Sequence, residues 1–413
     1  MDEMISVEFA KHMVLDHVHP LSAELVDLSS ALGATLAIDV VSDVDVPPFA
    51  NAAMDGYVTR LPVPPRSLPV RMPVHGEVRA GHPYVGEWPE HALLGMMTGA
   101  PIPSGTFAVI QREWVSEDER DAGYVWVHQW PEPNQHIRPP AKDLARGARC
   151  AQAGERITPS LIGMMAMAGA HHVQVTRAPR IGILSTGDEL VEVTSVPGPG
   201  QIRNSNGPTL SAQVIHAGAV PVGRVVADDE AQIATAVASL FETCDFVVGS
   251  GGVSVGKYDL VRRVLEDMGV VWHFWRVRQR PGKPLAFGTF GRVPFLGLPG
   301  NPVSASIGFE QYVRPAIRKM LGQQNWFAPL FRATLTQDTP KVKGLHFFAR
   351  AVATPSADGT FEIRDTGPQG SNLLHSMARA NAIMHLDADL GDDRRTVPAG
   401  TQVRFEFLPW TFQ

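Results

Sequence analysis

A glycine-rich segment, VVGSGGVSVGKYD at residues 247–259, is the first candidate for phosphate chemistry. Gly251 to Lys257 has the G-x-x-x-x-G-K spacing of a nucleotide-binding P-loop, in which Ser or Thr follows the lysine so that a short hydroxyl reaches Mg²⁺. Here Tyr258 follows the lysine, and its hydroxyl lies too far from the backbone for that role. The segment is therefore not a P-loop, and a different way of holding phosphate remains open.

Three glycine-rich turns of this kind follow apolar segments of the chain. Small side chains let backbone N–H groups approach a phosphate closely. In the third turn Asn301 stands at an expected helix N-cap and Pro302 at the first helical position, so this helix start is expected to receive an anion. One such turn alone merely joins a strand to a helix, whereas three at one sheet edge indicate a binding site. The turns are Ser185-Thr186-Gly187-Asp188-Glu189, Ser250-Gly251-Gly252-Val253-Ser254 and Leu298-Pro299-Gly300-Asn301-Pro302.

Four basic residues lie in the segment WRVRQRPGKP. Arg276, Arg278 and Arg280 alternate along an extended segment and are expected on one face, and Lys283 follows a Pro-Gly turn. Arg278 taken alone is typical of a solvated strand edge. Beside phosphate-sized turns, Arg280 and Lys283 predict an oxyanion site, because the Arg fork and the Lys point charge both suit tetrahedral anions.

Carboxylates near the same strand ends indicate a hard divalent cation. Glu189, Asp228, Asp229 and Asp259 all fall at turns. A carboxylate beside a phosphate is typical of a Mg²⁺ site, although another divalent cation has the same preference for oxygen. The competing interpretation makes one of Asp228 and Asp229 the N-cap of the helix that follows.

An α/β layer must position these groups. Between residues 180 and 320, apolar strand-like segments alternate with helical ones, which predicts a mainly parallel sheet. Ligands of such sheets bind beyond the carboxyl ends of the strands, where the three turns fall. The flanks, residues 46–140 and 326–413, hold short alternating runs, which predict a small β domain and a β barrel or sandwich.

Bulk properties exclude several classes of protein. No apolar run approaches the ~20 residues that span a bilayer, and the N-terminus lacks the basic-then-apolar pattern of a signal peptide. Cys150 and Cys244 form neither a zinc motif nor a disulfide framework. The net charge of −6 argues against nucleic-acid binding through a broad basic surface. We expect a cytoplasmic protein with no membrane or nucleic-acid partner.

Taken together, the motifs resemble those of the MoeA family, the molybdopterin molybdenumtransferases related to the E domain of gephyrin. The resemblance rests on STGDEL, SGGVSVGKYD, PGKPLAFG and GLPGNPVSA in the α/β region. DVPPFANAAMDGY, MMTGAPIPSG and NQHIRPPAKDL before it, and GLHFFAR and GPQGSNLLHSM after it, are similar as well. The likeness runs in consistent order from about residue 20 to residue 405.

The resemblance implies a fold of four parts and an elongated homodimer. Residues 1–45 and 139–177 would form a discontinuous linking domain that encloses a β domain at 46–138. An α/β molybdopterin-binding domain at 178–325 and a C-terminal β barrel at 326–413 would follow. The active site would lie between the α/β domain of one subunit and the N-terminal segments of the other. A molybdopterin adenylyltransferase and molybdoenzyme apoproteins, or their chaperones, would be further partners.

The implied reaction joins molybdate to the dithiolene of adenylylated molybdopterin and releases AMP. The three turns would hold the substrate, with Ser185, Thr186, Gly187, Gly251, Gly252, Ser254, Pro299, Gly300, Asn301 and Pro302 as contacts. Catalytic roles would fall to Asp55, Asp143, Thr98 and Glu189, and molybdate would bind Arg276, Arg280, Lys283, Arg350 and Ser376. Asp228, Asp229 and Asp259 would hold the metal, Mg²⁺ or another divalent cation.

Several positions depart from the family pattern. Ala52 stands where Ser is usual, Lys142 where an acid is usual, and Leu345 where an arginine is usual, while Arg276 and Arg280 replace lysines. A tungstate-inserting enzyme and a degenerate paralogue that binds cofactor or acts as a scaffold are the alternatives. The related adenylyltransferase is disfavoured, because it usually lacks both flanking β regions.

Overall fold

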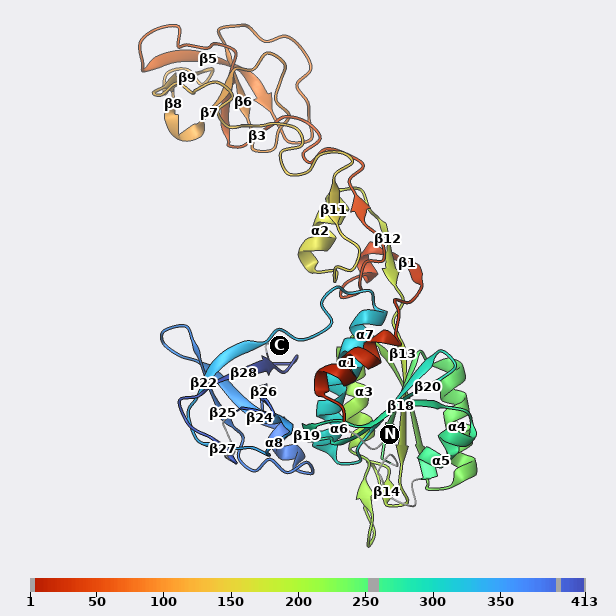
Figure 1. Cartoon of the computed structure of the whole chain (residues 1–413). Coiled ribbons are helices and arrows are strands. Elements are labelled where there is room, and N and C mark those ends of the chain that lie inside the picture. The colour runs from red at the N-terminus through yellow and green to blue at the C-terminus, as the bar shows by residue number, and fades with distance from the viewer. Residues whose placement is uncertain (1–3, 252–259, 391–394, 412–413) are drawn as a thin grey trace.

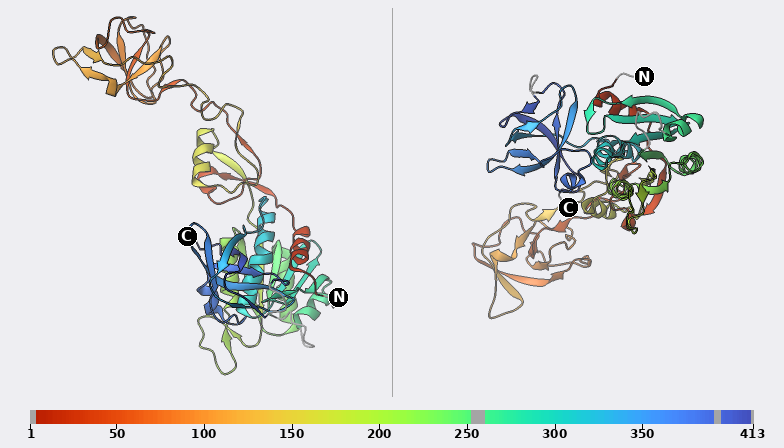
Figure 2. Two further views of the ribbon diagram at one scale, coloured as in Figure 1. Left: turned by 60° about the vertical axis from the view of Figure 1, so that its left-hand side comes forward. Right: turned by 90° about the horizontal axis from the view of Figure 1, so that it is seen from below.

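The computed structural model describes residues 4–251, 260–390 and 395–411. The chain is elongated: a small β unit lies at one end, and an α/β sheet and a β barrel lie side by side at the other, with a slender connecting part between them (Figures 1 and 2). We call the small β unit, strands β3–β10, the distal unit. Elements β1, β2, β11, β12 and α2, which connect it to the rest, form the linking unit.

The α/β unit is built on a six-stranded sheet with the order β16-β13-β17-β21-β20-β18. β13 pairs in parallel with β16 and β17, and β17 with β21, whereas β20 and β18 complete the sheet in antiparallel pairing. The predicted alternation of strands and helices is thus confirmed as a mixed, mainly parallel sheet. Its strands are β13 (Arg180–Thr186), β16 (Val220–Val226), β17 (Phe246–Ser250), β18 (Val271–Arg276), β20 (Pro284–Phe290) and β21 (Val293–Leu298).

Helices cover both faces of this sheet. The core on one face joins the sheet to α1 (Val7–Asp16), α3 (Asn206–His216), α6 (Pro302–Gly308) and α7 (Arg314–Met320). The core on the other face joins it to α4 (Glu230–Thr243) and α5 (Leu260–Asp267). A π-helical turn, Phe309–Val313, connects α6 to α7, so the helix predicted to begin at Pro302 continues as one helical rod with a single wide turn.

The C-terminal β barrel consists of five strands that close on themselves. β24 pairs with β25 and with β26, while β22 and β28 complete the circle. Its strands are β22 (Phe331–Leu335), β24 (His346–Pro355), β25 (Phe361–Asp365), β26 (Ala382–Leu386) and β28 (Gln402–Phe407). The sequence left barrel and sandwich open, and the closed pairing decides for the barrel.

Short elements attach the barrel to its surroundings. β19 (Gln279–Arg280), which lies between β18 and β20 along the chain, pairs in parallel with β24. The segment with the four basic residues therefore crosses from the sheet to the barrel. The remaining short elements here are α8 (Leu374–Ala378), β23 (Thr339–Pro340), β27 (Thr396–Val397) and, beside the α/β sheet, β14 (Leu190–Val191) and β15 (Ile202–Arg203).

The distal unit is a six-stranded sheet with the order β7-β4-β6-β5-β9-β8. The linking unit pairs β1 with β12 and β2 with β11, so the chain passes through it twice. Thr158 caps α2 by accepting a hydrogen bond from the Leu161 amide, and Pro159 follows at the first helical position. The boundaries of the four predicted domains remain a prediction.

The bounds of the remaining elements follow the alternating sequence runs. In the distal unit these are β3 (Asn51–Ala52), β4 (Gly56–Thr59), β5 (Val70–Val78), β6 (Leu93–Met96), β7 (Ala108–Gln111), β8 (Val115–Glu117), β9 (Tyr124–Val127), β10 (Ile137–Arg138) and a 3₁₀ turn, Arg112–Trp114. In the linking unit they are β1 (Ala23–Asp27), β2 (Val40–Val41), β11 (Arg149–Ala151), β12 (His172–Thr176), α2 (Pro159–Met167) and a 3₁₀ turn, Leu28–Ser30. Within the described ranges, no helix is long and apolar enough to cross a bilayer.

Candidate functional site

The three glycine-rich turns meet at the carboxyl ends of β13, β17 and β21. The Gly251 amide donates to the Leu298 carbonyl at 3.2 Å, which joins the second turn to the third. Gly251 has φ +94°, and a Cβ there would lie 3.0 Å from the Thr186 carbonyl oxygen. A Cβ on Gly300 would lie 3.7 Å from the Gly251 Cα. The three turns therefore lie in contact, and at Gly251 the positive φ and the close Thr186 carbonyl disfavour any larger residue.

Asn206, at the start of α3, locks two of these turns together. Its Nδ2 donates to the Ser250 Oγ at 2.7 Å and to the Gly300 carbonyl at 2.8 Å. The sequence analysis did not single out this residue. Its partners lie 44 and 94 residues away, so no local pattern marks it as part of the site.

The first turn presents a buried hydroxyl toward the same place. Ser185 and Thr186 are both buried, and the Thr186 Oγ1 has no hydrogen-bond partner among the described residues. A buried hydroxyl without a partner is costly unless a ligand or water satisfies it. The orphaned oxygen is therefore available to a polar ligand or to a water molecule.

The remaining predicted contacts of these turns are placed only in part. Pro299, Asn301 and Pro302 lie between the end of β21 and α6, and Asn301 has the backbone conformation of an N-cap. Its side chain makes no capping hydrogen bond, so the expected side-chain cap is absent. Gly252, Ser254 and Asp259 lie outside the described residues.

Acidic side chains gather beside the first turn. The Asp228 amide donates to the Asp188 Oδ1 at 3.0 Å, which joins the end of β16 to the turn after β13. Partial burial, together with the carboxylates of Asp188 and Glu189, raises the pKa of Asp228. Asp229 instead caps α4, because its Oδ1 accepts from the Gln232 amide at 2.9 Å. The expectation that one of the two acids is a helix cap is confirmed.

The raised pKa gives a pH-dependent prediction for Asp228→Asn. The folded protein disfavours the charged form of Asp228, so the protonated carboxyl contributes stability that is fully present below the ordinary carboxyl pKa. This stability is lost as pH rises through the raised pKa of the folded state. We expect the variant to gain stability relative to the parent between pH 4 and pH 7, by up to about 0.5 kcal/mol because the residue is exposed. Thermal unfolding across that pH range measures the gain. Asp229→Asn is the matched control, since Asn keeps the cap; an equal gain there would contradict the prediction.

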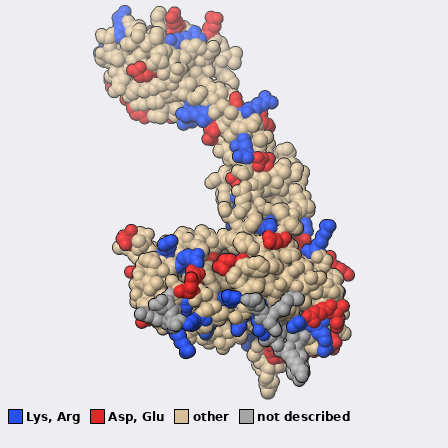
Figure 3. Space-filling view, in the orientation of Figure 1, with Lys and Arg blue, Asp and Glu red and all other residues tan. Residues whose placement is uncertain are grey.

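The predicted basic residues line the passage from the sheet to the barrel. Arg280 and Lys283 are exposed, Arg276 is half-buried, and the Arg278 Nε donates to the Met4 carbonyl at 2.9 Å. Arg280 lies over the Phe347 ring, 5.5 Å from its centroid, and lines a cavity of about 400 Å³. Figure 3 shows that basic and acidic groups are interspersed over the visible face of the molecule, without a broad basic patch there.

Arg350 and Ser376, as predicted, lie together, but they are buried. The Arg350 Nε donates to the Ser376 Oγ at 3.0 Å, and its terminal nitrogens donate to the carbonyls of Pro368, Gln369 and Gly370. Burial and the nearby Arg280 guanidinium lower the pKa of Arg350 to about 10. The guanidinium thus holds the loop 368–370, which forms one wall of the cavity that Arg280 lines.

Asp55 and Thr98 form a compact pair in the distal unit. The Thr98 amide and Oγ1 both donate to the Asp55 Oδ1 at 2.7 Å. These bonds, first from the hydroxyl and then from the amide, lower the pKa of Asp55, so its carboxylate is charged at neutral pH. The pair lies at the opposite end of the elongated chain from the three turns, and one chain does not bring them together (Figures 1 and 2).

Asp143 lies at the junction of the linking and distal units. It lines a cavity of about 680 Å³ together with Lys142, Arg138 and Asp45. The Asp143 amide donates to the Val46 carbonyl at 2.9 Å, and the Asp143 side chain is exposed. Asp143 is thus accessible, with Lys142 lining the same cavity, and it too is remote from the turns of its own chain.

The described carboxylates fit a metal ion only in part. Asp188, Glu189 and Asp228 supply the oxygen atoms that Mg²⁺ prefers, and their mutual repulsion would be relieved by a cation. Across the residues that the structure describes, no group of three acids, histidines or cysteines is close enough to surround one ion. We derive no reaction step through a metal.

Comparison with known proteins defines first the class of these units. Residues 182–319, which carry the three turns, match the model of a probable molybdopterin binding domain. Residues 5–169 match the MoeA N-terminal region (domain I and II), and residues 332–408 match the MoeA C-terminal region (domain IV). The α/β unit with its converging turns therefore belongs to the class described as a probable molybdopterin binding domain.

Relatives over the whole length then give the family. A Haemophilus influenzae protein named molybdopterin molybdenumtransferase is 37% identical, with 98% of each chain covered. A Mycobacterium tuberculosis protein named molybdopterin molybdenumtransferase 2 is 33% identical over 97% of this chain and 99% of its own. The crystal structure of the MoeA protein from Pyrococcus horikoshii OT3 matches with a TM-score of 0.82 at 27% identity, covering 98% of this chain and all of that one. The chain belongs to the MoeA family.

Proposed function

We propose that this protein inserts molybdate into adenylylated molybdopterin, with release of AMP, to give molybdenum cofactor. The observation that carries the proposal is the close packing of the three glycine-rich turns, with the orphaned Thr186 hydroxyl next to Gly251. The names of the relatives point to the same reaction. The proposal places the protein in the cytoplasm, where its two cysteines would stay reduced.

The turns would bind the phosphate groups of the adenylate. Backbone N–H groups of small residues donate to phosphate oxygens without side-chain obstruction, and the Thr186 hydroxyl would add one more hydrogen bond. Asn206 would keep the second and third turns at a fixed spacing, since it is bonded to both. The substrate would then find a preformed site rather than order one on binding.

The Arg280 cavity would receive molybdate, a tetrahedral dianion. Arg280 and Lys283 are exposed and free to turn toward an oxyanion. Arg350 and Ser376 would act indirectly, because their hydrogen bonds already hold each other and the loop 368–370. Arg276, half-buried at the end of β18, would add positive charge nearby.

A homodimer would complete the site. Asp55 and Thr98 lie far from the turns of their own chain, so a second copy must bring its distal unit to this sheet if they are to act there. The charged Asp55 would orient a water molecule or accept its proton, and Asp143 and Glu189 would serve as further acids. A molybdopterin adenylyltransferase would supply the substrate, and molybdoenzyme apoproteins or their chaperones would accept the product.

The proposed reaction would also use Mg²⁺, bound next to the phosphate groups of the adenylate. Oxygen atoms of Asp228 and Glu189 would contribute to holding it together with phosphate oxygens of the adenylate, and a divalent cation there would supply neutralising charge. The predicted ligand Asp259 lies outside the described residues, and Asp229 is engaged as a helix cap.

The test is AMP release from purified adenylylated molybdopterin, measured with and without molybdate or tungstate in the presence of Mg²⁺. We expect release that requires molybdate. Release with tungstate but not with molybdate would mean that the protein inserts tungstate instead. Tight binding of the adenylate with no release under any condition would overturn the proposal and indicate a paralogue that binds or scaffolds.

We expect Asn206→Ala to raise the KM for the adenylate roughly tenfold, because loss of two hydrogen bonds of about 1 kcal/mol each loosens the turns. Steady-state AMP release measures KM and kcat separately. Asn381→Ala is the matched control, because the side-chain amide group of Asn381 also makes two hydrogen bonds, both with the Ala353 backbone in the barrel. An equal rise in KM in both variants would show that general destabilisation, rather than turn spacing, is responsible.

A further inference from the structure

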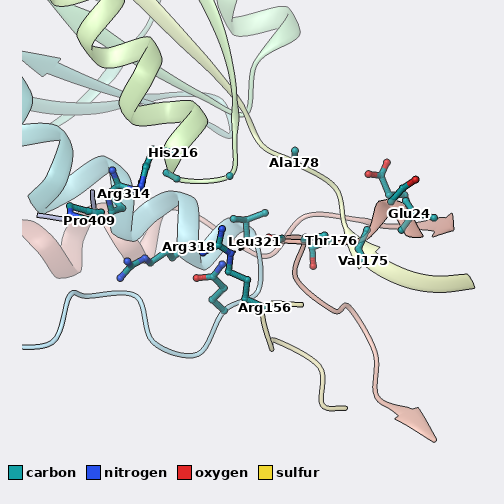
Figure 4. A pocket seen from close by; sticks show the side chains of 17 residues that line it. Glu24, Arg156, Val175, Thr176, Ala178, His216, Arg314, Arg318, Leu321 and Pro409 are labelled. Atoms are coloured by element: carbon teal, nitrogen blue, oxygen red, sulfur yellow. Dashed lines mark hydrogen bonds between the residues drawn. The ribbon is translucent and has the colours of Figure 1, made fainter. Parts of the chain in front are cut away.

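A cavity of about 420 Å³ lies at the junction between the linking unit and the α/β unit (Figure 4). One wall comes from the linking unit and the residues next to it, including Glu24, Arg156 and Thr176. The other comes from the end of α3 and from α7, including Arg314 and Arg318. A molecule bound here would touch both units at once. The volume of the cavity falls within the range of small-molecule sites.

Positive charge dominates the cavity. Three arginines line it, Arg156, Arg314 and Arg318, against one acid, Glu24. In Figure 4 the arginines lie together on one side and Glu24 lies away from them. Burial, and after it the charges of Arg314 and Arg156, lower the pKa of Arg318 against the opposing effect of Glu310 and Glu406. The cavity therefore concentrates like charges in a partly desolvated place.

The three guanidinium groups differ in their pairing with acids. Arg314 is neutralised by Glu310, with Nε to Oε2 at 2.5 Å and a terminal nitrogen to Oε1 at 2.9 Å. Within the described ranges no ion pair includes Arg156 or Arg318. Arg318 donates to the Trp326 carbonyl at 3.2 Å and Arg156 to the Gly33 carbonyl at 3.3 Å.

Capping of backbone carbonyls explains only part of this arrangement. Arg318 lies in the last turn of α7, where a cation is favoured. Each of these bonds uses one of the five N–H donors that a guanidinium carries, so most of its fork is left for another acceptor. Carbonyl capping also gives no reason for arginines of two separate units to point into one cavity.

We propose that this cavity binds a small molecule that carries a phosphate or a similar tetrahedral oxyanion, held between Arg156 and Arg318. The fork of each guanidinium matches such an anion. The cavity is larger than a free phosphate, so the anion would carry an organic group. This site is separate from the three glycine-rich turns and does not rest on the proposed function.

Occupancy of the site would fix the angle between the two units. Arg156 moves with the linking unit and Arg318 with α7, so an anion bonded to both joins them. The linking unit carries the distal unit with Asp55 and Thr98 at its end. Binding at the junction would therefore restrict where that distal pair can be placed.

The experiment uses the full chain with inorganic phosphate and, separately, AMP as probes. Calorimetry gives the affinity, and hydrogen exchange locates the ligand. We expect protection in segments 28–36 and 314–323. Arg156→Gln and Arg318→Gln should each weaken binding at least tenfold, and Arg66→Gln, an exposed arginine of the distal unit, should not. AMP tighter than phosphate would identify a phosphate ester as the ligand, and phosphate as tight as AMP would identify the free anion.

Three outcomes would overturn the proposal. One is the absence of binding by either probe. The second is equal affinity in all the variants. The third is protection confined to the turns at 184–189 and 298–303, which would place the anion at the other site. Arg156 is exposed, so its variant is expected to fold and keeps the test decisive even if Arg318→Gln is unstable.

Discussion

Asp55→Asn is expected to lower the rate of molybdate-dependent AMP release by about 10²–10⁴-fold, the usual contribution of a positioned acid or base. Asn has the shape of Asp, and its carbonyl oxygen can still accept both hydrogen bonds that Thr98 donates to Asp55 at 2.7 Å. The local fold should therefore persist while the negative charge is lost. Single-turnover AMP release, which isolates the chemical step, measures the effect.

Asp358→Asn provides an unusually close control for this variant. The Asp358 Oδ1 accepts from the Thr360 amide at 3.0 Å and from the Thr360 Oγ1 at 2.7 Å, the same arrangement in an exposed turn of the barrel. Both carboxyl groups have a lowered pKa for the same reason. We expect Asp358→Asn to leave AMP release unchanged. Similar rates for the two variants would remove Asp55 from the mechanism.

Thr98→Val tests the same pair through pH. Loss of the Thr98 hydroxyl removes the first of the two bonds that lower the pKa of Asp55, so that pKa should rise toward its ordinary value. Activity that requires charged Asp55 is lost as pH falls through this pKa. The acidic limb of the pH profile should therefore move to higher pH in Thr98→Val, and an unmoved limb would contradict the role.

The second large effect is expected for Glu310→Ala, at about 3–5 kcal/mol of destabilisation. Glu310 and Arg314 form an i, i+4 ion pair whose side chains are only 4% and 5% exposed. Removing the acid leaves a buried guanidinium without its counter-charge, which costs this much in other proteins. The Gln213 Nε2 also donates to the Glu310 Oε1 at 2.7 Å, so the change reaches α3.

Hydrogen exchange at amides 303–320 measures the loss, since a chain of several domains does not unfold in one step. Glu266→Ala is the matched control: Arg262 and Glu266 are also paired at i, i+4, but both are exposed, and the expected cost is below about 1 kcal/mol. The double variant Glu310→Leu with Arg314→Leu should recover most of the stability, because it buries no charge. Equal costs for Glu310→Ala and Glu266→Ala would contradict the argument.

Local patterns predicted much of the α/β unit. β13, β17 and β21 are short apolar runs that end in small residues, and the meeting of their turns follows from parallel pairing. The barrel was predicted as one of two architectures, because alternation in strands such as Phe361–Asp365 specifies a half-buried sheet but not its closure. Hydrogen bonds between distant strands decide that closure.

Other features of the site depend on contacts that no local pattern encodes. Asn206 acts through two turns far along the chain. The burial of Arg350 follows from its place on the outer face of β24, where α8 and the loop 368–370 cover it, whereas its sequence neighbours resemble any strand. The π-helical turn Phe309–Val313 buries Glu310 and Gln311 side by side, the first bonded to Gln213 of α3 and the second to Lys11 of α1. Regular α-helical periodicity does not place two successive polar residues inward. The pairing of Asp55 with Thr98 came from the family resemblance alone.

The chain passes twice through the linking unit, beside the cavity lined by Arg156 and Arg318, and this has a mechanical consequence. The two connecting strands are bonded to each other, with β1 against β12 and the Arg177 amide donating to the Ser22 carbonyl at 3.0 Å. A ribbon of two strands resists bending within its own plane far more than bending across it. The linking unit should therefore bend mainly in one direction, across the plane of the ribbon. Asp55, in the distal unit, should then move along an arc, and in the proposed homodimer this would restrict the positions it samples before it reaches the other subunit.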